Sequence, residues 1–167
     1  MTLLDIRIYP DPVLKHRAVE VTKVDSSVKR LLADMVETMY AANGVGLAAP
    51  QVGVSQRIAV VDVSENGDAP MHFVNPEIIT SEGEASGEEG CLSIPEYRDS
   101  VTRNTKITVR ALDIEGRPFE IVAEGLLAVC LQHEIDHLDG VLFIDRLSRL
   151  KREMFKKWYA KRQVKED

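Results

Sequence analysis

The chain has 167 residues, of which 44% are hydrophobic and 29% charged, and this composition is typical of a single globular domain over residues 1–167. The formal net charge of −6 argues against a protein that coats DNA or RNA over its whole surface. No apolar run approaches the roughly 20 residues of a membrane span, and Asp5 interrupts the apolar start of a signal peptide, so we expect a cytoplasmic protein without membrane or DNA partners.

The first predicted element is an amphipathic helix over about 26–42, because its apolar side chains recur at three- and four-residue steps. Asp25 or Ser26 is a suitable N-cap for this helix. Short apolar stretches rich in β-branched residues then predict buried strands. These strands cover about residues 57–63, 71–79, 107–114 and 119–123.

Two further helices are predicted in the C-terminal part of the chain. One covers about 124–138, and the other begins near 146 with apolar and aromatic side chains along one face. The last segment, 146–167, holds nine Lys or Arg and three Asp or Glu, so it carries +6 whereas residues 1–145 carry −12. The order of elements indicates an α+β fold with largely antiparallel sheets around the helix over 124–138, followed by a basic amphipathic helix.

The strongest local motif is H-E-x-x-H, which lies on the helix predicted over 124–138. His133 and His137 are four residues apart, so both imidazoles share one helix face and can reach one metal ion. Glu134 is next to the first of them and can act as general base on a metal-bound water. A chance match is a weak alternative, because the chain has only four His.

The motif leaves the third metal ligand open. The longer zinc-peptidase pattern H-E-x-x-H-x-x-G-x-x-H is met up to Gly140, but Phe143 stands where its last His belongs. Glu153 is the downstream acid that could serve, although its basic neighbours favour a solvated helix face. Cys130 lies on the helix of the His pair, but three ligands from one helix wrap a metal poorly, and its apolar neighbours favour a thiol in the core.

Cys91 is the other candidate for the third ligand. It follows Gly90 in a polar segment, where glycine lets the backbone approach a site closely. A thiolate and two imidazoles leave a fourth position for water, which is the open geometry of hydrolytic metal sites. The two cysteines are too few for a disulfide framework, and a reducing compartment keeps both as thiols.

The segment 44–49, Gly-Val-Gly-Leu-Ala-Ala, formally fits the G-x-G-x-x-A motif of dinucleotide-binding proteins. That motif needs a strand before it and a helix after it, whereas here a helix precedes it and Pro50 interrupts the stretch after it. The glycines instead let a strand-like backbone pass close to another chain or a substrate, with Gln51 offering an amide donor. A plain turn into a strand is the alternative.

Three segments together resemble the motifs of the peptide deformylase family in sequence, order and spacing. They are GVGLAAPQ at 44–51, EGCLS at 89–93 and QHEIDH at 132–137. The resemblance covers most of the chain, from Tyr-Pro-Asp-Pro at 9–12 to the last helix. It implies a metallohydrolase that removes the N-formyl group from the formyl-methionine of newly synthesised polypeptides and releases formate.

The resemblance also implies a metal site. Cys91, His133 and His137 would bind one divalent ion, which is Fe²⁺ in this family and can be replaced by Zn²⁺, Ni²⁺ or Co²⁺. Glu134 would then take a proton from the attacking water and deliver it to the leaving amine. This assignment of the third ligand comes from the family and not from spacing.

The family's substrate contacts map onto the other motif residues. The Gln51 side-chain amide and the Leu92 backbone N–H would stabilise the oxyanion. The extended peptide would pair with Val45-Gly46 and with the strand near Cys91. Its methionine side chain would enter an apolar pocket that includes Val45, Leu126, Cys130 and His133.

The basic C-terminal helix has two interpretations. Its apolar stripe docks on the body while Lys and Arg face water, or the helix also contacts the ribosome, as the terminal helix of similar family members does. RNA phosphates would attract its +6 charge, with an affinity that falls as salt rises.

Two alternatives to a deformylase stay open on the sequence. One is a small zinc endopeptidase that uses His133, His137 and Glu153. The other is a non-catalytic module in which the metal site is structural.

Overall fold

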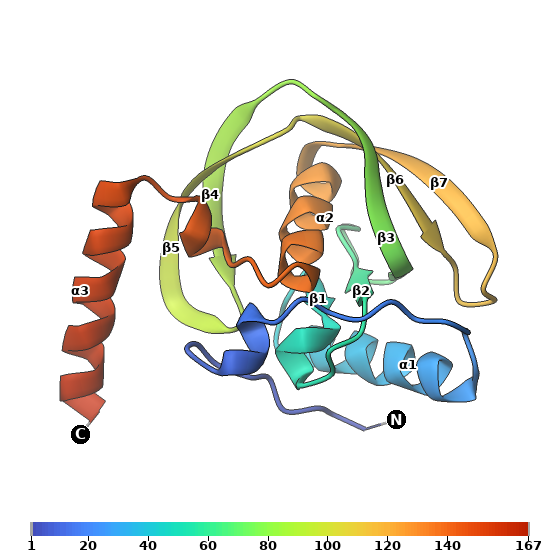
Figure 1. Ribbon diagram of the computed structural model, residues 1–167, viewed down its shortest axis with the longest axis horizontal. Coiled ribbons are helices and arrows are strands. Elements are labelled where there is room, and N and C mark those ends of the chain that lie inside the picture. Colours follow the sequence, from blue (N-terminus) through green and yellow to red (C-terminus); the bar gives the residue numbers. More distant parts are fainter. Residues whose placement is uncertain (1, 167) are drawn as a thin grey trace.

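The computed structural model describes residues 2–166 as two antiparallel sheets with a helix between them (Figure 1). The larger sheet has five strands in the order β1-β2-β3-β6-β7, and the smaller sheet pairs β4 with β5. The strands are β1 Gly46–Ala48, β2 Ile58–Val61, β3 Met71–Glu82, β4 Ala85–Cys91, β5 Ile94–Arg103, β6 Lys106–Leu112 and β7 Pro118–Glu124. This architecture confirms the predicted α+β class with antiparallel sheets.

The helices of the described chain lie close to their predicted positions. The α-helices are α1 Ser26–Ala41, α2 Gly125–Leu138 and α3 Arg149–Glu166, and three short 3₁₀ helices are η1 Pro12–Lys15, η2 Ala49–Val52 and η3 Phe143–Arg146. Asp25 caps α1, because its carboxylate accepts a hydrogen bond from the Val28 backbone N–H at 3.1 Å. The predicted helices over 26–42 and 124–138 are therefore confirmed.

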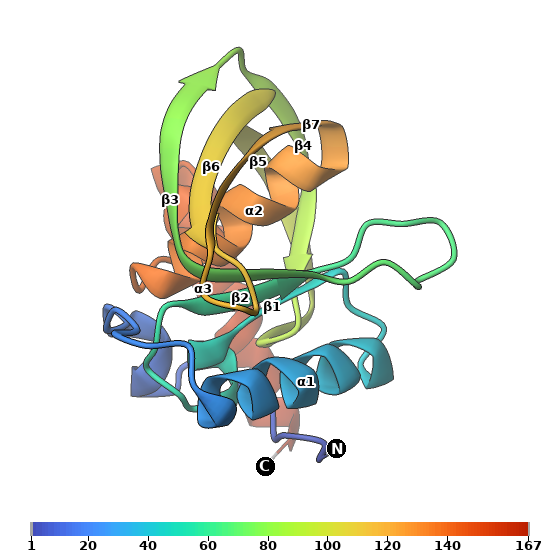
Figure 2. The ribbon, with the colours of Figure 1, turned by 90° about the vertical axis from the view of Figure 1, so that its right-hand side faces the viewer.

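Helix α2 is enclosed by the two sheets and by the segment around η2 (Figure 2). Its apolar side chains Ala128, Leu131 and Ile135 pack in one cluster with Phe73 of β3 and Val109 of β6. Nearly every residue from Cys130 to Leu138 is buried, so polar groups on this half of the helix must find partners inside the protein. The H-E-x-x-H motif lies on this buried half.

The two-stranded sheet of β4 and β5 was not predicted from the sequence. Only two apolar side chains of this hairpin, Ile94 and Val101, are buried in the core, so its sequence lacks a continuous apolar alternation. The ladder shifts register between Gly90 and Cys91, directly before the turn. Such bulges re-aim side chains, and this one lies where the chain approaches α2.

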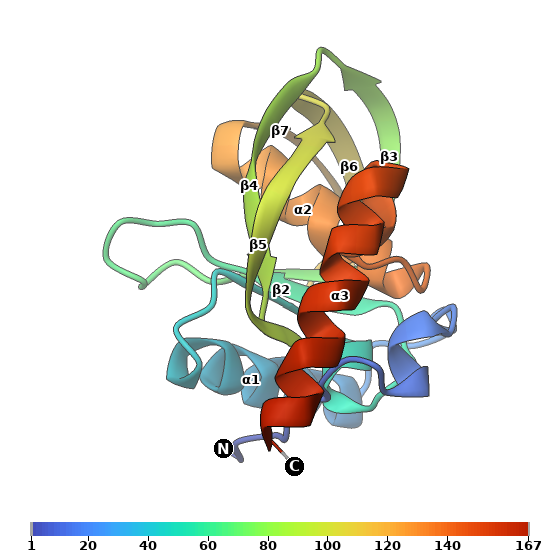
Figure 3. The same ribbon diagram turned by 90° about the vertical axis from the view of Figure 1, so that its left-hand side faces the viewer.

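The C-terminal helix begins at Arg149 rather than at the predicted 146. Phe143–Arg146 forms η3 instead, in which the Asp145 carboxylate accepts a hydrogen bond from the Leu142 backbone N–H at 2.9 Å. Helix α3 then runs along the outside of the molecule beside β5 (Figure 3). An aromatic cluster joins it to the body, made by Tyr9, Tyr97, Phe155, Trp158 and Tyr159. The predicted domain and helix also include Met1 and Asp167, which lie outside the described residues.

Among residues 2–166, no helix combines the length and the hydropathy that crossing a membrane requires.

Candidate active site

Cys91, His133 and His137 each bring one donor atom to the same point beside α2. These atoms lie within 4.8 Å of one another, and they are the one such group of His, Cys or acidic donors in the described part of the chain. The Nε2 atom of His137 is 3.1 Å from Nε2 of His133 and 3.4 Å from Sγ of Cys91. The helix supplies the two imidazoles from one face, and the end of β4 supplies the thiol.

The spacing of these three donors fits a metal ion. In a tetrahedral site with metal–N distances of about 2.05 Å and a metal–S distance of about 2.3 Å, two nitrogens are about 3.3 Å apart and N and S about 3.6 Å apart. The observed 3.1 Å and 3.4 Å are each only about 0.2 Å shorter. One sulfur and two nitrogen donors at this spacing can hold a single divalent transition metal.

The His137 ring is in the protonation state that metal binding requires. It is fully enclosed, and burial lowers the pKa of its imidazole well below the usual value, with the neighbouring His133 acting in the same direction. A neutral imidazole has a lone pair to offer, whereas a charged one has none.

A buried chain of charged groups orients the His133 ring. Its Nδ1 atom is 3.1 Å from Oε1 of Glu89, and Arg103 donates to both carboxylate oxygens of Glu89 at 2.9 and 3.0 Å. Arg103 also donates to Asp136 at 2.6 Å, and Arg146 donates to Asp136 at 2.7 and 3.0 Å. This series of side chains therefore alternates positive and negative groups from the three-donor group to the surface.

The ionisation of Glu89 fixes the tautomer of His133. Burial alone would raise the pKa of Glu89, but hydrogen bonds from His133 and Arg103 outweigh burial and lower that pKa to about 2. An ionised carboxylate only accepts hydrogen bonds, so Nδ1 of His133 must donate. Nε2, which faces the other two donors, is then the ring atom left to coordinate a metal ion.

Sequence reasoning missed Glu89, Arg103 and Asp136 as parts of the site. They come from β4, β5 and α2, and only the tertiary fold brings them together. Two signals were available: Glu89 stands within the polar segment that carries Cys91, and Asp136 interrupts an apolar helix.

Glu134 is buried beside the glycine strand β1. Among the described residues its Oε1 atom has no hydrogen-bond partner, and a Cβ atom at Gly46 would overlap its Oε2 atom. Burial raises the pKa of Glu134 to about 7. A carboxyl group with this pKa can both accept and donate a proton near neutrality, and glycine at 46 is what leaves room for it.

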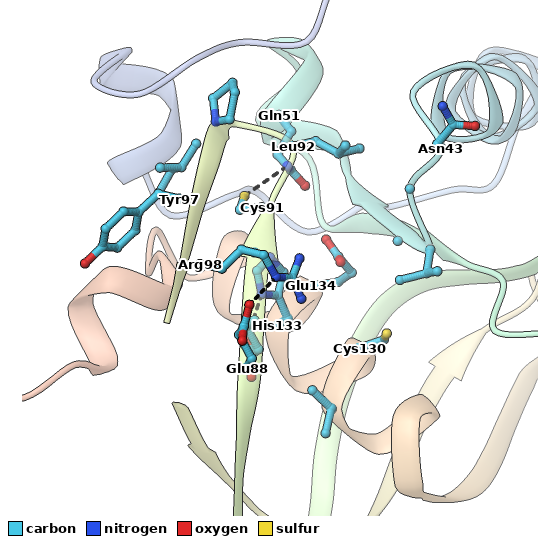
Figure 4. A pocket seen from close by; sticks show the side chains of 18 of the residues that line it. Asn43, Gln51, Glu88, Cys91, Leu92, Tyr97, Arg98, Cys130, His133 and Glu134 are labelled. Carbon is cyan, nitrogen blue, oxygen red and sulfur yellow. Dashed lines mark hydrogen bonds and ion pairs between the residues drawn. The ribbon is translucent and has the colours of Figure 1, made fainter. Parts of the chain in front are cut away.

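Gln51 and Leu92 reach the same place from two segments distant in sequence (Figure 4). Gln51 lies in η2, and its side-chain nitrogen Nε2 is 3.6 Å from Sγ of Cys91. Leu92 lies in the turn between β4 and β5 and lines the same cavity as Gln51. The structure therefore brings both predicted oxyanion donors to the side of the three-donor group.

A cavity of about 580 Å³ opens beside these groups. The four predicted substrate-binding residues all line it, together with Glu134 and His133: they are Val45, Gly46, Leu126 and Cys130. Burial raises the pKa of the Cys130 thiol to about 12, so this side chain is an apolar wall and not a reactive thiolate. Val45 and Leu126 are about half exposed, and they leave apolar surface at the mouth of the cavity.

Glu153, the alternative third ligand, is not part of the three-donor group. It lies exposed on α3, where its carboxylate is 3.5 Å from Nζ of Lys156. This position agrees with a solvated helix face.

Comparisons with known proteins agree with this geometry. Residues 3–153 match the family described as Polypeptide deformylase. A peptide deformylase of Alkalilimnicola ehrlichii is 56% identical over 158 residues, which cover 94% of this chain and 89% of that protein.

Solved structures of similar proteins share the fold as well. A crystal structure of a peptide deformylase from Legionella pneumophila has a TM-score of 0.91 and 50% identity, and the match covers 99% of this chain and 98% of the other. Peptide deformylase from Ehrlichia chaffeensis, in complex with actinonin, has a TM-score of 0.91 and 43% identity, with 97% and 98% covered. The chain therefore belongs to the polypeptide deformylase family, and it is an enzyme of this group of metal-dependent hydrolases, which remove the N-formyl group from nascent peptides.

Proposed function

We propose that this enzyme deformylates formyl-methionyl nascent polypeptides with Cys91, His133 and His137 holding one divalent ion. The observation that carries the proposal is the convergence of these three donors beside a cavity that is lined by Cys91, His133 and the buried Glu134. Fe²⁺ is the expected ion from the family resemblance. The donor set, one sulfur and two nitrogens, is equally suited to Zn²⁺, Ni²⁺ or Co²⁺ as replacements.

The cavity favours a catalytic metal site over a structural one. Structural zinc sites are closed by four protein ligands, whereas catalytic sites have three and an open position. The described chain offers three donors here, beside a cavity large enough for several residues of a peptide. Among the described residues, the buried Oε1 atom of Glu134 has no hydrogen-bond partner, and this costs stability. A purely structural metal site does not need such a group.

Glu134 is the proton-transfer group of this proposal. The metal, when bound, lowers the pKa of a water and polarises the formyl carbonyl. The Glu134 carboxylate accepts the proton of the attacking water and donates it to the amine that leaves when the C–N bond breaks. Burial disfavours the charged form of this carboxylate, so the protonated form needed for the second transfer is accessible.

The remaining motif residues bind and orient the substrate. The Gln51 amide and the Leu92 backbone N–H stabilise the negative charge that develops on the formyl oxygen. The peptide lies extended beside Val45-Gly46, since β1 is an edge strand that pairs with β2 alone among the described residues. Leu126 and Cys130 form the wall against which the flexible methionine side chain packs.

An anaerobic formate-release assay with a formyl-Met tripeptide, combined with metal analysis of the same preparation, tests this function. We expect formate and free α-amine in equal amounts and one metal ion per chain. Cleavage of internal peptide bonds without formate would instead support the zinc endopeptidase. A metal-loaded protein that does neither would have a structural site. Actinonin, which the E. chaffeensis relative binds, is expected to compete with the peptide.

We further propose that the enzyme works in the cytoplasm, with α3 in contact with the ribosome. The segment 146–167 carries +6 on an otherwise acidic chain. Helix α3 docks through Phe155 and leaves Leu150, Met154 and Val164 exposed among its basic residues. A helix with basic and apolar groups on its outer face suits the phosphates and proteins of a ribosomal surface.

A further inference from the structure

Partners at both ends of the amide hold the Gln51 side chain in one orientation. Its Oε1 atom accepts a hydrogen bond from the Ala48 backbone N–H at 3.0 Å. The Nε2 atom therefore points the other way, where it donates to Oγ of Ser93 at 3.2 Å and lies 3.6 Å from Sγ of Cys91. Gln51 and Ser93 are only 2% and 0% exposed, so bulk water does not compete for these contacts.

The planarity of the amide turns the contact with Ser93 into a directional constraint. The two N–H bonds of Nε2 lie in one plane about 120° apart. When one of them is directed at Ser93 Oγ, the other points toward Cys91 Sγ and the cavity. Without the hydroxyl, the first N–H is buried with no acceptor, and the amide gains by turning to find another. The Ser93 hydroxyl thus sets the direction of the second N–H.

A third segment fixes the separation between Gln51 and Ser93. The Arg7 backbone N–H donates to the backbone carbonyl of Gln51 at 2.6 Å, and the Tyr9 backbone N–H donates to the backbone carbonyl of Ser93 at 2.8 Å. Two residues of one N-terminal stretch therefore bridge η2 and the turn between β4 and β5. The relative position of hydroxyl and amide is set by backbone bonds and does not depend on a substrate.

We propose that Ser93 is a positioning residue, whose hydroxyl aims the second Gln51 N–H at the developing oxyanion. Its side chain is fully buried behind Leu92 and Ile94, which do line the cavity, so it acts through Gln51. The proposal rests on the oxyanion role proposed for Gln51 and adds the group that orients it. Preorganised donors are effective because they need no reorientation when charge develops.

A double-mutant cycle on the metal-loaded enzyme tests the proposal. The kcat and KM for a formyl-Met tripeptide are measured for wild type, Ser93→Ala, Gln51→Met and the double variant. We expect Ser93→Ala to lower kcat about tenfold with little change in KM, because the lost interaction acts in the transition state. In the Gln51→Met background, Ser93→Ala is expected to have no further effect on kcat.

Stability and metal content are followed in every variant. Ser93→Ala is expected to hold one metal ion per chain, and Ser93→Gly, which removes the same hydroxyl, should show the same coupling if the alanine variant folds poorly. Val101→Ala is the matched control, since Val101 is a buried residue of the same two-stranded sheet. It should lower the thermal stability and leave kcat unchanged.

The outcomes separate the two proposals. An equal loss of kcat in both backgrounds would overturn the role of Ser93, because its effect would then not pass through Gln51. Normal kcat in Ser93→Ala beside a large loss in Gln51→Met would also overturn it and leave the oxyanion role of Gln51 intact. Unchanged kcat in Gln51→Met would reject that oxyanion role, and the role of Ser93 with it.

Discussion

His133 Nδ1 donates to Oε1 of Glu89 across 3.1 Å, inside the protein, while Arg103 holds the other side of the same carboxylate. Replacing Glu89 by Gln removes the negative charge that orients the His133 ring. Within residues 2–166, the buried positive charge of Arg103 is then balanced by Asp136 alone. We expect a metal affinity about 10- to 100-fold weaker. The free energy of unfolding should fall by about 3 kcal/mol.

Chelator competition and urea unfolding measure these two effects of Glu89→Gln. The adjacent Glu88 provides a matched control, because it forms an exposed ion pair with Arg98 at 2.8 Å. Glu88→Gln should change the free energy of unfolding by less than about 1 kcal/mol and leave metal affinity unchanged. Similar effects of the two substitutions would contradict the role of the buried chain of charges.

Replacing Glu134 by Gln separates catalysis from metal binding. The amide has the same shape but cannot accept the proton of water, so kcat for formate release should fall by roughly 10³-fold. Metal content should stay at one ion per chain. Thermal stability should be equal or higher, because a neutral amide is less costly to bury than a carboxylate. Substantial turnover in this variant would exclude Glu134 as the base.

The third ligand is tested by two alanine variants. Cys91→Ala removes a donor that is 3.4 Å from His137 Nε2, so the purified protein should contain little metal and release no formate. Glu153→Ala changes an exposed residue of α3 and should keep full metal content and activity. Metal loss in Glu153→Ala with normal metal content in Cys91→Ala would contradict the deformylase ligand set and support that of a zinc endopeptidase.

Asp62 makes stability depend on pH in the acid range. Hydrogen bonds from Ser64 and Tyr40 lower the pKa of Asp62 to about 2, against 3.8 for an aspartate in the unfolded chain. A folded-state pKa below the unfolded one stabilises the protein above about pH 4, and this contribution is lost as the pH falls toward 2. Asp62→Asn should therefore be less stable at pH 7 and lose less stability between pH 4 and 2.

Urea unfolding at several pH values measures the effect of Asp62→Asn. Glu65, an exposed residue of the same loop, is the matched control. Glu65→Gln should follow the wild-type slope between pH 4 and 2, and an equally shallow slope in this control would assign the acid sensitivity to other carboxylates.

The ribosome contact is tested by co-sedimentation at several salt concentrations. One variant replaces three exposed lysines of α3 by alanine, namely Lys156, Lys157 and Lys161. It should sediment less with ribosomes and show a weaker salt dependence, with unchanged kcat on a short peptide. The control replaces three exposed basic residues elsewhere: Arg17, Lys23 and Arg117. An equal loss of co-sedimentation in both variants would indicate non-specific attraction between basic residues and the ribosome.

Elements with a strong apolar pattern could be predicted from the sequence, and those held by cross-strand polar pairs could not. Helices α1 and α2 and strands β2, β3 and β6 each bury two or more apolar side chains in the core, and β7 packs Phe119, Ile121 and Ala123 against it. The hairpin of β4 and β5 instead includes contacts such as Ser86 with Thr102, whose hydroxyls are 2.8 Å apart. Such pairs join residues that are distant along the chain, and no local periodicity reports them.

The site divides in the same way. The spacing of His133 and His137 placed both rings on one helix face, because that spacing is a property of the helix itself. Cys91 was assigned as the third ligand only through the family resemblance, since nothing in the local sequence determines how far β4 lies from α2. The ion pairs of Arg103 with Glu89 and Asp136 connect three elements and required the fold.

Because the two sheets are separate, a bound metal ion would also stabilise the fold. Cys91 belongs to a hairpin that shares no ladder with the five-stranded sheet in the described chain, whereas His133 and His137 belong to the helix between them. An ion held by all three would act as a cross-link, since it binds only when Cys91 lies beside His133 and His137. The hairpin should then exchange its amide hydrogens faster in the apoprotein than in the loaded enzyme. Metal shortage in a cell would therefore lower the lifetime of the folded chain as well as its activity.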